Sequence, residues 1–267
     1  MARAAPGVER TIAVLNWLAA HPDHAFTLTD LVRGLNLNRA TCHALLAALA
    51  DAGYVYRDSA KAYRLGPALA AIGEIAHDSF LPIALARDDM RSLAESLGLV
   101  CIAAGRVGLE IVILERVVPA MHLAMSLNLG ARVTIEGPAG LSFMAWAPAA
   151  DAERWLQALF KTRGEAEGRR WAEAMAIVRR LGFCFGRIQP TGAAAPPTSL
   201  PPGETFNLSY VSAPVLNDAD EIIFSIALQG FDRPYDSAEL QGLGVRLRDV
   251  CETARKRIYG HAIATGR

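Results

Sequence analysis

The first fifty residues contain three stretches in which apolar side chains recur at the three-to-four-residue spacing of an amphipathic helix. They cover residues 8–20, 27–35 and about 38–50. Thr27 stands three residues before Asp30, which is the spacing of a capping box with Asp in place of the usual Glu. We therefore predict three short helices that share one core, with the first stripe running through Ile12, Leu15, Leu18 and Ala19.

The third predicted helix has two contrasting faces. Its apolar stripe consists of Cys42, Leu45, Leu46 and Leu49. Its other face carries a guanidinium and an imidazole among small side chains: Arg39, Ala40, His43, Ala44 and Ala47. Small side chains allow a helix to approach another surface closely, as reading of the major groove of DNA requires. The alternative interpretation is the solvated face of an alanine-rich helix.

The next segment, AGYVYRDSAKAYRLG (residues 52–66), predicts two short aromatic strands joined by a turn at DSAK. Three helices followed by such a hairpin indicate a winged helix-turn-helix, in which the hairpin lies along the phosphate backbone. We expect operator contacts from Arg39, Thr41 and His43 and phosphate contacts from Arg57, Lys61 and Arg64.

The remaining chain predicts a linker helix and then an α+β domain. Residues 66–78 have Pro67 in the favoured first turn of a helix. The segments 99–105 and 109–117 alternate as an antiparallel pair, and so do 205–216 and 221–230. Helical stretches are expected at about 138–147, 150–160 and 168–181, a loop at 191–203, and a last helix from Leu240 to Ile258.

Composition excludes several classes of protein. The chain has 267 residues, of which 52% are hydrophobic and 20% charged, and 27 basic residues balance 27 acidic ones. Its length favours two domains, and its net charge of zero gives no sign of an acidic partner. Four dispersed cysteines form no CxxC pair, and no apolar run reaches the length of a membrane helix. We expect a cytoplasmic protein that has no cofactor, metal site or membrane contact.

Catalytic motifs are missing from the sequence. The segment GLSFM lacks the last glycine of a nucleophile elbow, and neither a P-loop nor HExxH occurs. His122 has no recognisable partner. We therefore do not expect an enzyme.

Nearly the whole chain resembles the IclR-type transcriptional regulators. The motifs that carry the resemblance are VERTIAVLNWL, LTDLVRGLNLNRATCHALLAAL, GYVYRDSAKAYRLG and SAPVLNDADEIIFSIALQG. The resemblance implies a winged helix-turn-helix over residues 1–66, a linker helix over 67–79 that dimerises, and a GAF-like effector-binding domain over 80–267, with helices flanking an antiparallel sheet. One departure is Ala44, where the family usually has Arg after the histidine of the recognition helix.

The resemblance also implies where the effector binds. The pocket would be lined by Pro138, Ala139 and Gly140 and by two late strands. Tyr210, Ala227 and Gln229 stand where relatives that bind small oxo-acids have Cys and two Ser, and Ile135 and Glu136 replace His and Ala. With Leu123, Met125 and Phe143 the cavity becomes more apolar, which favours an aromatic or otherwise bulky organic acid over glyoxylate or pyruvate.

The sequence thus predicts a sequence-specific DNA-binding transcriptional regulator controlled by a small-molecule effector. Its expected partners are a double-stranded DNA operator, the effector and a second copy of the chain, in a homodimer or a dimer of dimers (tetramer). The alternative is an enzyme or ligand-carrying protein that uses the winged helix for protein contact.

Overall fold

The computed structural model describes residues 5–79, 81–120, 129–135, 137–188, 194–197 and 199–265. The chain divides into two compact units, Met1–Phe80 and Leu81–Arg267. Each unit has its own hydrophobic core, so each is described by itself.

The N-terminal unit begins with three helices, α1 (Pro6–Ala20), α2 (Leu28–Gly34) and α3 (Arg39–Asp51). Thr27 caps α2 through the expected capping box, because its hydroxyl accepts from the Asp30 amide while the Asp30 carboxylate accepts from the Thr27 amide. The buried side chains of the helices are Val14, Leu18, Leu31, Cys42, Leu46 and Leu49. The three predicted helices are therefore confirmed.

Two residues of the expected buried stripe of α1, Ile12 and Ala19, are exposed. Ile12 is 50% exposed, whereas Val14 and Leu18 are buried. A helix turns by about 100° per residue, so Val14 lies almost opposite Ile12. The side of α1 that carries Val14 and Leu18 packs in the core of this unit, and the side that carries Ile12 faces solvent.

A small sheet completes the unit. Strands β2 (Val55–Arg57) and β3 (Ala62–Leu65) form the predicted hairpin. A third strand, β1 (Phe26–Thr27), pairs with β3, with Thr27 opposite Ala62. The strand order is β1-β3-β2, so the hairpin is tied to the residue that caps α2. The unit ends with α4 (Pro67–Ser79).

The C-terminal unit is built on a seven-stranded antiparallel sheet of order β6-β5-β4-β11-β10-β7-β8. The two predicted hairpins form its centre: β4 (Val100–Val107) with β5 (Glu110–Val117), and β10 (Leu208–Leu216) with β11 (Ile222–Gln229). β4 lies next to β11, with Ile102 opposite Ala227. The outer strands are β6 (Arg132–Thr134), β7 (Cys184–Ile188) and β8 (Ala194–Ala195).

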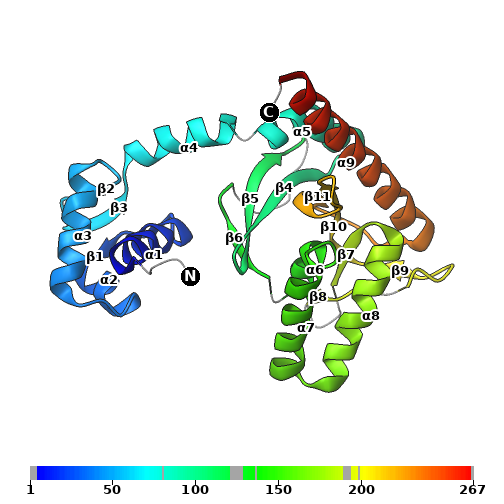
Figure 1. Cartoon of the computed structure of the whole chain (residues 1–267), viewed down its shortest axis with the longest axis horizontal. Coiled ribbons are helices and arrows are strands. Elements are labelled where there is room, and N and C mark those ends of the chain that lie inside the picture. Colours follow the sequence, from blue (N-terminus) through cyan, green and yellow to red (C-terminus); the bar gives the residue numbers. More distant parts are fainter. Residues whose placement is uncertain are drawn as a thin grey trace. The chain divides into compact units, whose positions relative to one another are not determined.

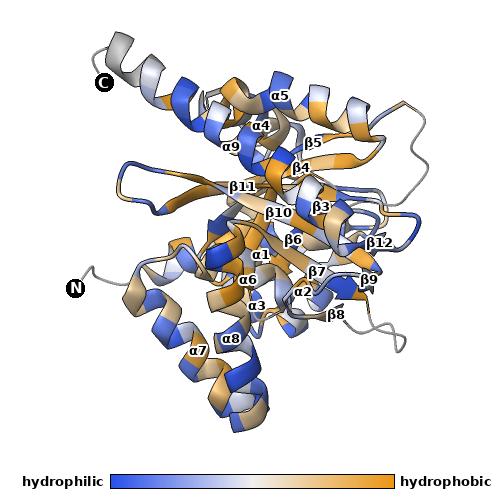
Figure 2. Cartoon of the chain, turned by 90° about the vertical axis from the view of Figure 1, so that its right-hand side faces the viewer, coloured by the Kyte–Doolittle hydropathy of each residue, from blue (hydrophilic) through white to orange (hydrophobic). Residues whose placement is uncertain are grey.

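Helices cover both faces of this sheet (Figure 1). One face packs against α5 (Leu81–Leu97) and α9 (Ser237–Thr265). The other face packs against α6 (Pro138–Met144), α7 (Ala149–Arg163) and α8 (Glu165–Leu181). Figure 2 shows the hydrophobic colour of the central strands and the hydrophilic stretches on α8 and α9. The α+β fold class expected from the sequence is confirmed.

The sequence did not predict the outer strands β6 and β7, and two predicted segments differ from the structure. The predicted strand 205–216 is interrupted at Asn207, and its first part, β9 (Thr205–Phe206), pairs with β12 (Tyr235–Asp236) in a separate two-stranded sheet. The predicted loop 191–203 contributes β8, which pairs with β7. β8 and β9 have only two residues each, so no alternating pattern could reveal them.

Candidate functional site

The exposed face of α3 is the first candidate site. Asn38 caps this helix, because its side-chain oxygen accepts from the Thr41 amide at 2.7 Å. Behind this cap, the side chains predicted to face away from the core are all exposed: Arg39, Ala40, His43, Ala44 and Ala47. Thr41 is half-buried. The helix therefore presents a guanidinium and an imidazole on a surface that is otherwise made of methyl groups.

Arg39 also contacts the neighbouring helix. Its Nη1 donates to Oγ1 of Thr29 in the first turn of α2 at 3.4 Å, a long and weak hydrogen bond. Thr29 was not among the residues singled out from the sequence. The helix-turn-helix arrangement, which brings the start of α2 near the start of α3, is the signal that could have identified it.

The tip of the β2–β3 hairpin is held in shape by Asp58. Its carboxylate accepts from the Ala62 amide at 2.8 Å, and its carbonyl oxygen accepts from the Lys61 amide at 3.0 Å. Lys61 has a φ of 62°, in the left-handed region, and its side chain is exposed. The Arg57 guanidinium lies 5.5 Å from the centre of the Tyr63 ring and donates to the Lys61 carbonyl at 3.3 Å.

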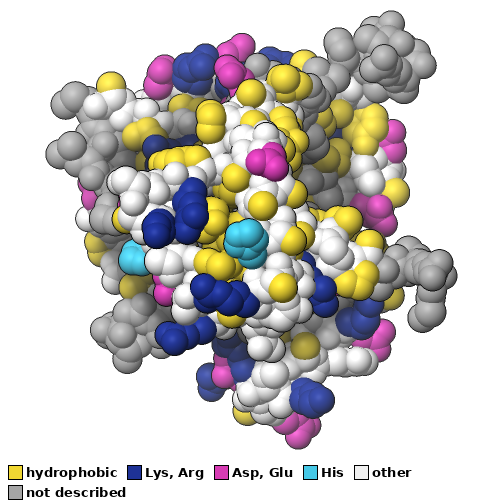
Figure 3. Space-filling model, turned by 90° about the vertical axis from the view of Figure 1, so that its left-hand side faces the viewer, with side chains coloured by type: hydrophobic (Ala, Val, Ile, Leu, Met, Phe, Trp, Pro, Cys, Tyr) yellow, Lys and Arg dark blue, Asp and Glu magenta, His cyan; other side chains and the backbone are white. Residues whose placement is uncertain are grey.

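Arg57, Lys61 and Arg64 thus come from one hairpin, as predicted. Arg57 and Lys61 are exposed and Arg64 is half-buried. Figure 3 shows Lys, Arg and His side chains on one face, with hydrophobic, other polar and some acidic side chains between them. Residues 5–66 contain five acidic and six basic side chains, and two of the acidic ones, Asp30 and Asp58, accept hydrogen bonds from backbone amides.

The second candidate site lies on one face of the large sheet. Ala227 of β11 packs in the core between the sheet and helices α6–α8. Gln229 lies two residues further along the strand, so its side chain points to the same face of the sheet as that of Ala227. Val211 of β10 is opposite Leu228, which brings their neighbours Tyr210 and Gln229 together across the strands. The sheet therefore brings together three of the predicted effector residues.

Tyr210 lies over a glycine. A Cβ at Gly186, its partner on β7, would lie 2.4 Å from Cε1 of Tyr210, so any larger residue would displace the ring. The Tyr210 hydroxyl is 3.6 Å from Sγ of Cys184. Burial raises the pKa of Tyr210 well above its ordinary value and raises the pKa of Cys184 to about 11. Both groups are therefore neutral at physiological pH and act as hydrogen-bonding groups.

A buried pair of serines adjoins this tyrosine. Ser142 of α6 and Ser212 of β10 share a hydrogen bond of 2.8 Å, and both are almost fully buried. Ser225 is buried on the same side of β11 as Ala227. Sequence reasoning missed these hydroxyls, although the two-residue period of a strand relates Ser212 to Tyr210 and Ser225 to Ala227.

The start of α6 provides the remaining described residues of the predicted pocket. Pro138 and Ala139 are half-buried, and Phe143 is buried against the sheet. A Cβ at Gly140 would lie 1.7 Å from the carbonyl oxygen of Ile135. The backbone of α6 therefore approaches the backbone at Ile135 so closely that only glycine fits at position 140. Leu123, Met125 and Glu136, together with His122, lie outside the described residues.

The described part of the chain contains neither a metal-binding cluster nor a membrane-spanning helix. No three His, Cys, Asp or Glu side chains lie close enough together to hold a metal ion. Within the same ranges, no helix combines the length and the apolar character that crossing a membrane requires.

These observations define a class: a winged helix-turn-helix unit followed by an α+β unit with a polar cluster beneath its sheet-covering helices. Residues 7–59 match the model of the IclR helix-turn-helix domain, so the N-terminal unit contains a domain of that family. None of the curated protein sequences matches the chain.

Solved structures extend the likeness to nearly the whole chain. An IclR transcriptional regulator from Alicyclobacillus acidocaldarius has 19% identity and a TM-score of 0.75, covering 95% of this chain and 98% of that one. An IclR homologue from Microbacterium hydrocarbonoxydans, solved with 4-hydroxybenzoate, has 16% identity and a TM-score of 0.67, covering 95% and 99%. HmgR of Pseudomonas aeruginosa has 18% identity and a TM-score of 0.66, with the same coverage. The chain has the fold of IclR regulators, and the family resemblance inferred from its motifs is confirmed.

Proposed function

We propose that the chain is a sequence-specific DNA-binding transcriptional regulator controlled by a small-molecule effector. The observation that carries the proposal is the exposed face of α3, where Arg39 and His43 stand among three alanines behind a capped helix start. A helix of this shape fits the major groove, which admits one α-helix. The match of residues 7–59 to the IclR helix-turn-helix domain supports this assignment.

The two groups of basic residues have different roles in this proposal. Arg39, His43 and Thr41 contact the operator from α3, and Arg39 can donate two hydrogen bonds to a guanine. Arg57, Lys61 and Arg64 contact phosphates, which fixes the position of the unit on the duplex but does not select a base. In the absence of DNA the Arg39 guanidinium makes a weak hydrogen bond to Thr29, near the start of α3.

The regulator acts as a homodimer or as a dimer of dimers. A single DNA-binding module buries roughly 600–1,000 Å² on DNA, less than most specific complexes bury. A symmetric dimer doubles this area and reads a pseudo-palindrome. The dimer contact is assigned to α4, where Ile72 and Ile75 are 48% and 68% exposed.

The effector is an aromatic or otherwise bulky organic acid that contacts Tyr210, Ala227 and Gln229, together with Phe143 and the start of α6. Ala227 and Phe143 give this region apolar walls, while Gln229 and the neutral Tyr210 hydroxyl supply hydrogen bonds. Leu123 and Met125 are assigned to the same pocket from the sequence alone. The similar structure solved with 4-hydroxybenzoate supports an aromatic acid.

DNA binding is tested by fluorescence anisotropy with fragments flanking the protein's own gene, at several salt concentrations. Arg39→Ala should cost about 1–3 kcal/mol at the preferred site and relax base preference. Lys61→Asn removes the charge but tolerates the positive φ, so it should weaken binding to all sequences alike and flatten the salt dependence. Arg170→Ala, an exposed position on α8, is the control. Wild-type binding by both variants would refute the proposed DNA interface.

Effector binding is tested by titrating the full chain with 4-hydroxybenzoate and, separately, with pyruvate and glyoxylate. The aromatic acid should bind more tightly, and Gln229→Ala and Tyr210→Phe should weaken its binding. Saturable binding of pyruvate or glyoxylate that both variants leave unchanged would contradict the assignment of the effector class.

A further inference from the structure

The C-terminal unit contains a hollow at the turn between β4 and β5. It has a volume of about 380 Å³, within the range of roughly 300–1,000 Å³ that small-molecule sites occupy. Its apolar walls are Leu109, Ile135, Met144 and Trp155. Leu109 is 78% exposed, so a molecule bound here would cover apolar surface that water now contacts.

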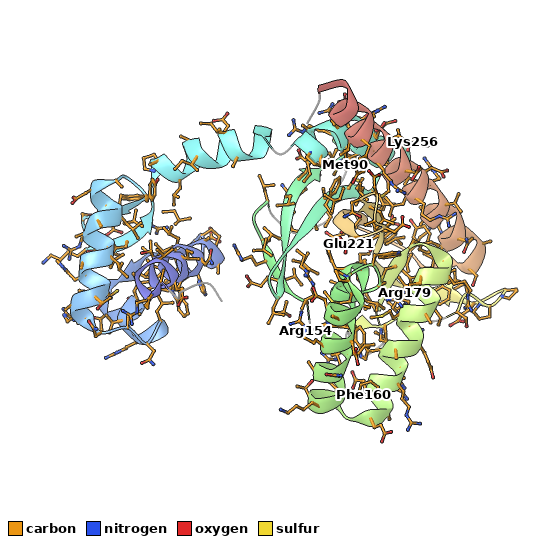
Figure 4. All side chains as sticks on the ribbon, viewed as in Figure 1. Met90, Arg154, Phe160, Arg179, Glu221 and Lys256 are labelled. Carbon is orange, nitrogen blue, oxygen red and sulfur yellow. The ribbon has the colours of Figure 1, made fainter. Side chains whose placement is uncertain are left out.

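The charged side of the hollow contains two arginines and one carboxylate. Arg106 Nη2 donates to Oδ2 of Asp151 at 2.7 Å, and Arg154 Nη2 donates to the other carboxylate oxygen. These hydrogen bonds hold the pKa of Asp151 below its ordinary value, so the carboxylate is ionised at neutral pH. The three side chains together carry a net positive charge. Figure 4 labels Arg154, which extends from α7.

Most of the donors on these two guanidinium groups remain open among the described residues. Each guanidinium has five N–H donors. Arg106 uses one of them on Asp151, and Arg154 uses one on Asp151 and one on the Ala150 carbonyl at 3.3 Å. Planar guanidinium groups bind carboxylates through two parallel hydrogen bonds, so the hollow has unused capacity for a second carboxylate.

We propose that this hollow binds an organic monoanion whose carboxylate contacts Arg106 and Arg154 and whose apolar body packs on Leu109, Met144 and Trp155. Phe143, Tyr210, Ala227 and Gln229 of the effector pocket proposed above do not line this hollow, whereas Ile135, just before α6, lies in its wall. It is a second ligand site on the same unit and does not depend on DNA binding. Asp151 opposes the ligand, because its negative charge repels a second carboxylate and offsets part of the charge of the two guanidinium groups.

Isothermal titration calorimetry on the full chain tests the site with 2-naphthoate and with the neutral 2-naphthamide. Wild type should bind the acid at least ten-fold more tightly than the amide. Arg106→Gln and the more exposed Arg154→Gln should each weaken binding of the acid about ten-fold. Asp151→Asn should strengthen it several-fold, because the negative charge that opposes the ligand is removed. Arg169→Gln removes an exposed ion pair on α8 and should leave binding unchanged.

Two variants that add the same phenyl ring at different positions show where the ligand binds. Ala158, exposed on α7, lines the hollow, so Ala158→Phe should fill it and weaken 2-naphthoate binding at least ten-fold. Ala176→Phe places the same ring on an exposed position of α8 and is the matched control.

The proposal would be overturned by no binding of 2-naphthoate, by equal affinity for acid and amide, or by binding that Ala158→Phe leaves intact. Binding that Gln229→Ala removes and Ala158→Phe does not would place the acid in the effector pocket instead. Weaker binding by Asp151→Asn would also contradict the site, because loss of the opposing charge requires the opposite sign.

Discussion

Gly66 and Gly53 lie backbone against backbone: a Cβ at Gly66 would be 2.2 Å from the carbonyl oxygen of Gly53. Gly53 follows α3 with a φ of 72°, and Gly66 follows the hairpin. The Gly53 oxygen accepts from the Ala68 amide at 3.2 Å, and the Gly66 amide donates to Tyr54 at 2.7 Å. The end of α3, the hairpin and the start of α4 are therefore joined at one point.

Gly66→Ala should destabilise the N-terminal unit, because the contacted atom is backbone and cannot move aside as a side chain could. Overpacking of this kind costs about 1–3 kcal/mol, which should lower the Tm of a unit this size by at least about 5 °C. Circular dichroism melting measures the change. Gly73→Ala is the control, since a Cβ there meets nothing within 4 Å, and it should be neutral or stabilising. Equal melting of both variants would contradict the close contact.

The capping box predicts a pH dependence for the same unit. Hydrogen bonds from Thr27 lower the pKa of Asp30 below the ordinary value of 3.8. A carboxyl whose pKa is lower in the folded state stabilises that state above its unfolded pKa, and this contribution is lost as the pH falls through the folded pKa. The free energies of unfolding of wild type and Asp30→Asn should therefore differ most above about pH 4 and converge in stronger acid. Urea denaturation at pH 6 and at pH 3 measures the free energy of unfolding of both proteins. A difference between them that is larger at pH 3 than at pH 6 would contradict the prediction.

Ile75→Glu should dissociate the proposed dimer. Ile72 and Ile75 share one side of α4 and are exposed in the single chain, and burial of a carboxylate at an apolar contact is costly. Light scattering at micromolar concentration should show a monomer, with weaker operator binding. Ala70→Glu adds the same charge on the opposite side of α4 and should leave the dimer intact. A monomeric wild type with full operator affinity would exclude this contact.

Gly186→Ala should change the effector response through Tyr210. The added methyl group meets the Tyr210 ring and the Ser209 hydroxyl, each at 2.4 Å, and must displace them. We expect weaker binding of 4-hydroxybenzoate. Tyr210→Ala removes one of the two clashes, so a double-mutant cycle should show that the two changes are not additive. Additive effects on the free energy of binding would mean that the ring does not lie over Gly186.

Local patterns in the sequence predicted much of this fold. The Thr27–Asp30 spacing located the start of α2, because a capping box needs only four consecutive residues. Two short aromatic segments on either side of a turn predicted the hairpin that contains Arg57 and Lys61. Alternation of apolar and polar residues predicted the strand that carries Ala227 and Gln229, and the family resemblance assigned these two residues to the effector pocket.

Other features depend on residues that are distant along the chain. The pairing of Thr27 with Ala62 joins a two-residue strand to the hairpin, and β4 lies beside β11 although more than a hundred residues separate them. The Ser142–Ser212 pair exists only because α6 packs on β10. No local periodicity encodes such contacts, since they follow from how the elements pack.

Thr27 belongs to β1 and caps α2 at the same time, and this has a consequence for the choice of operator. β3 of the hairpin pairs with Thr27, and α2 packs against α3, so in the proposed complex the packing of the unit sets the span between the phosphate contacts and the groove contacts. DNA must adapt to that span by bending or by changing its groove width, and the energy of doing so depends on sequence. Base pairs that the protein never touches should therefore influence affinity, and flexible steps between the contacted positions should be favoured.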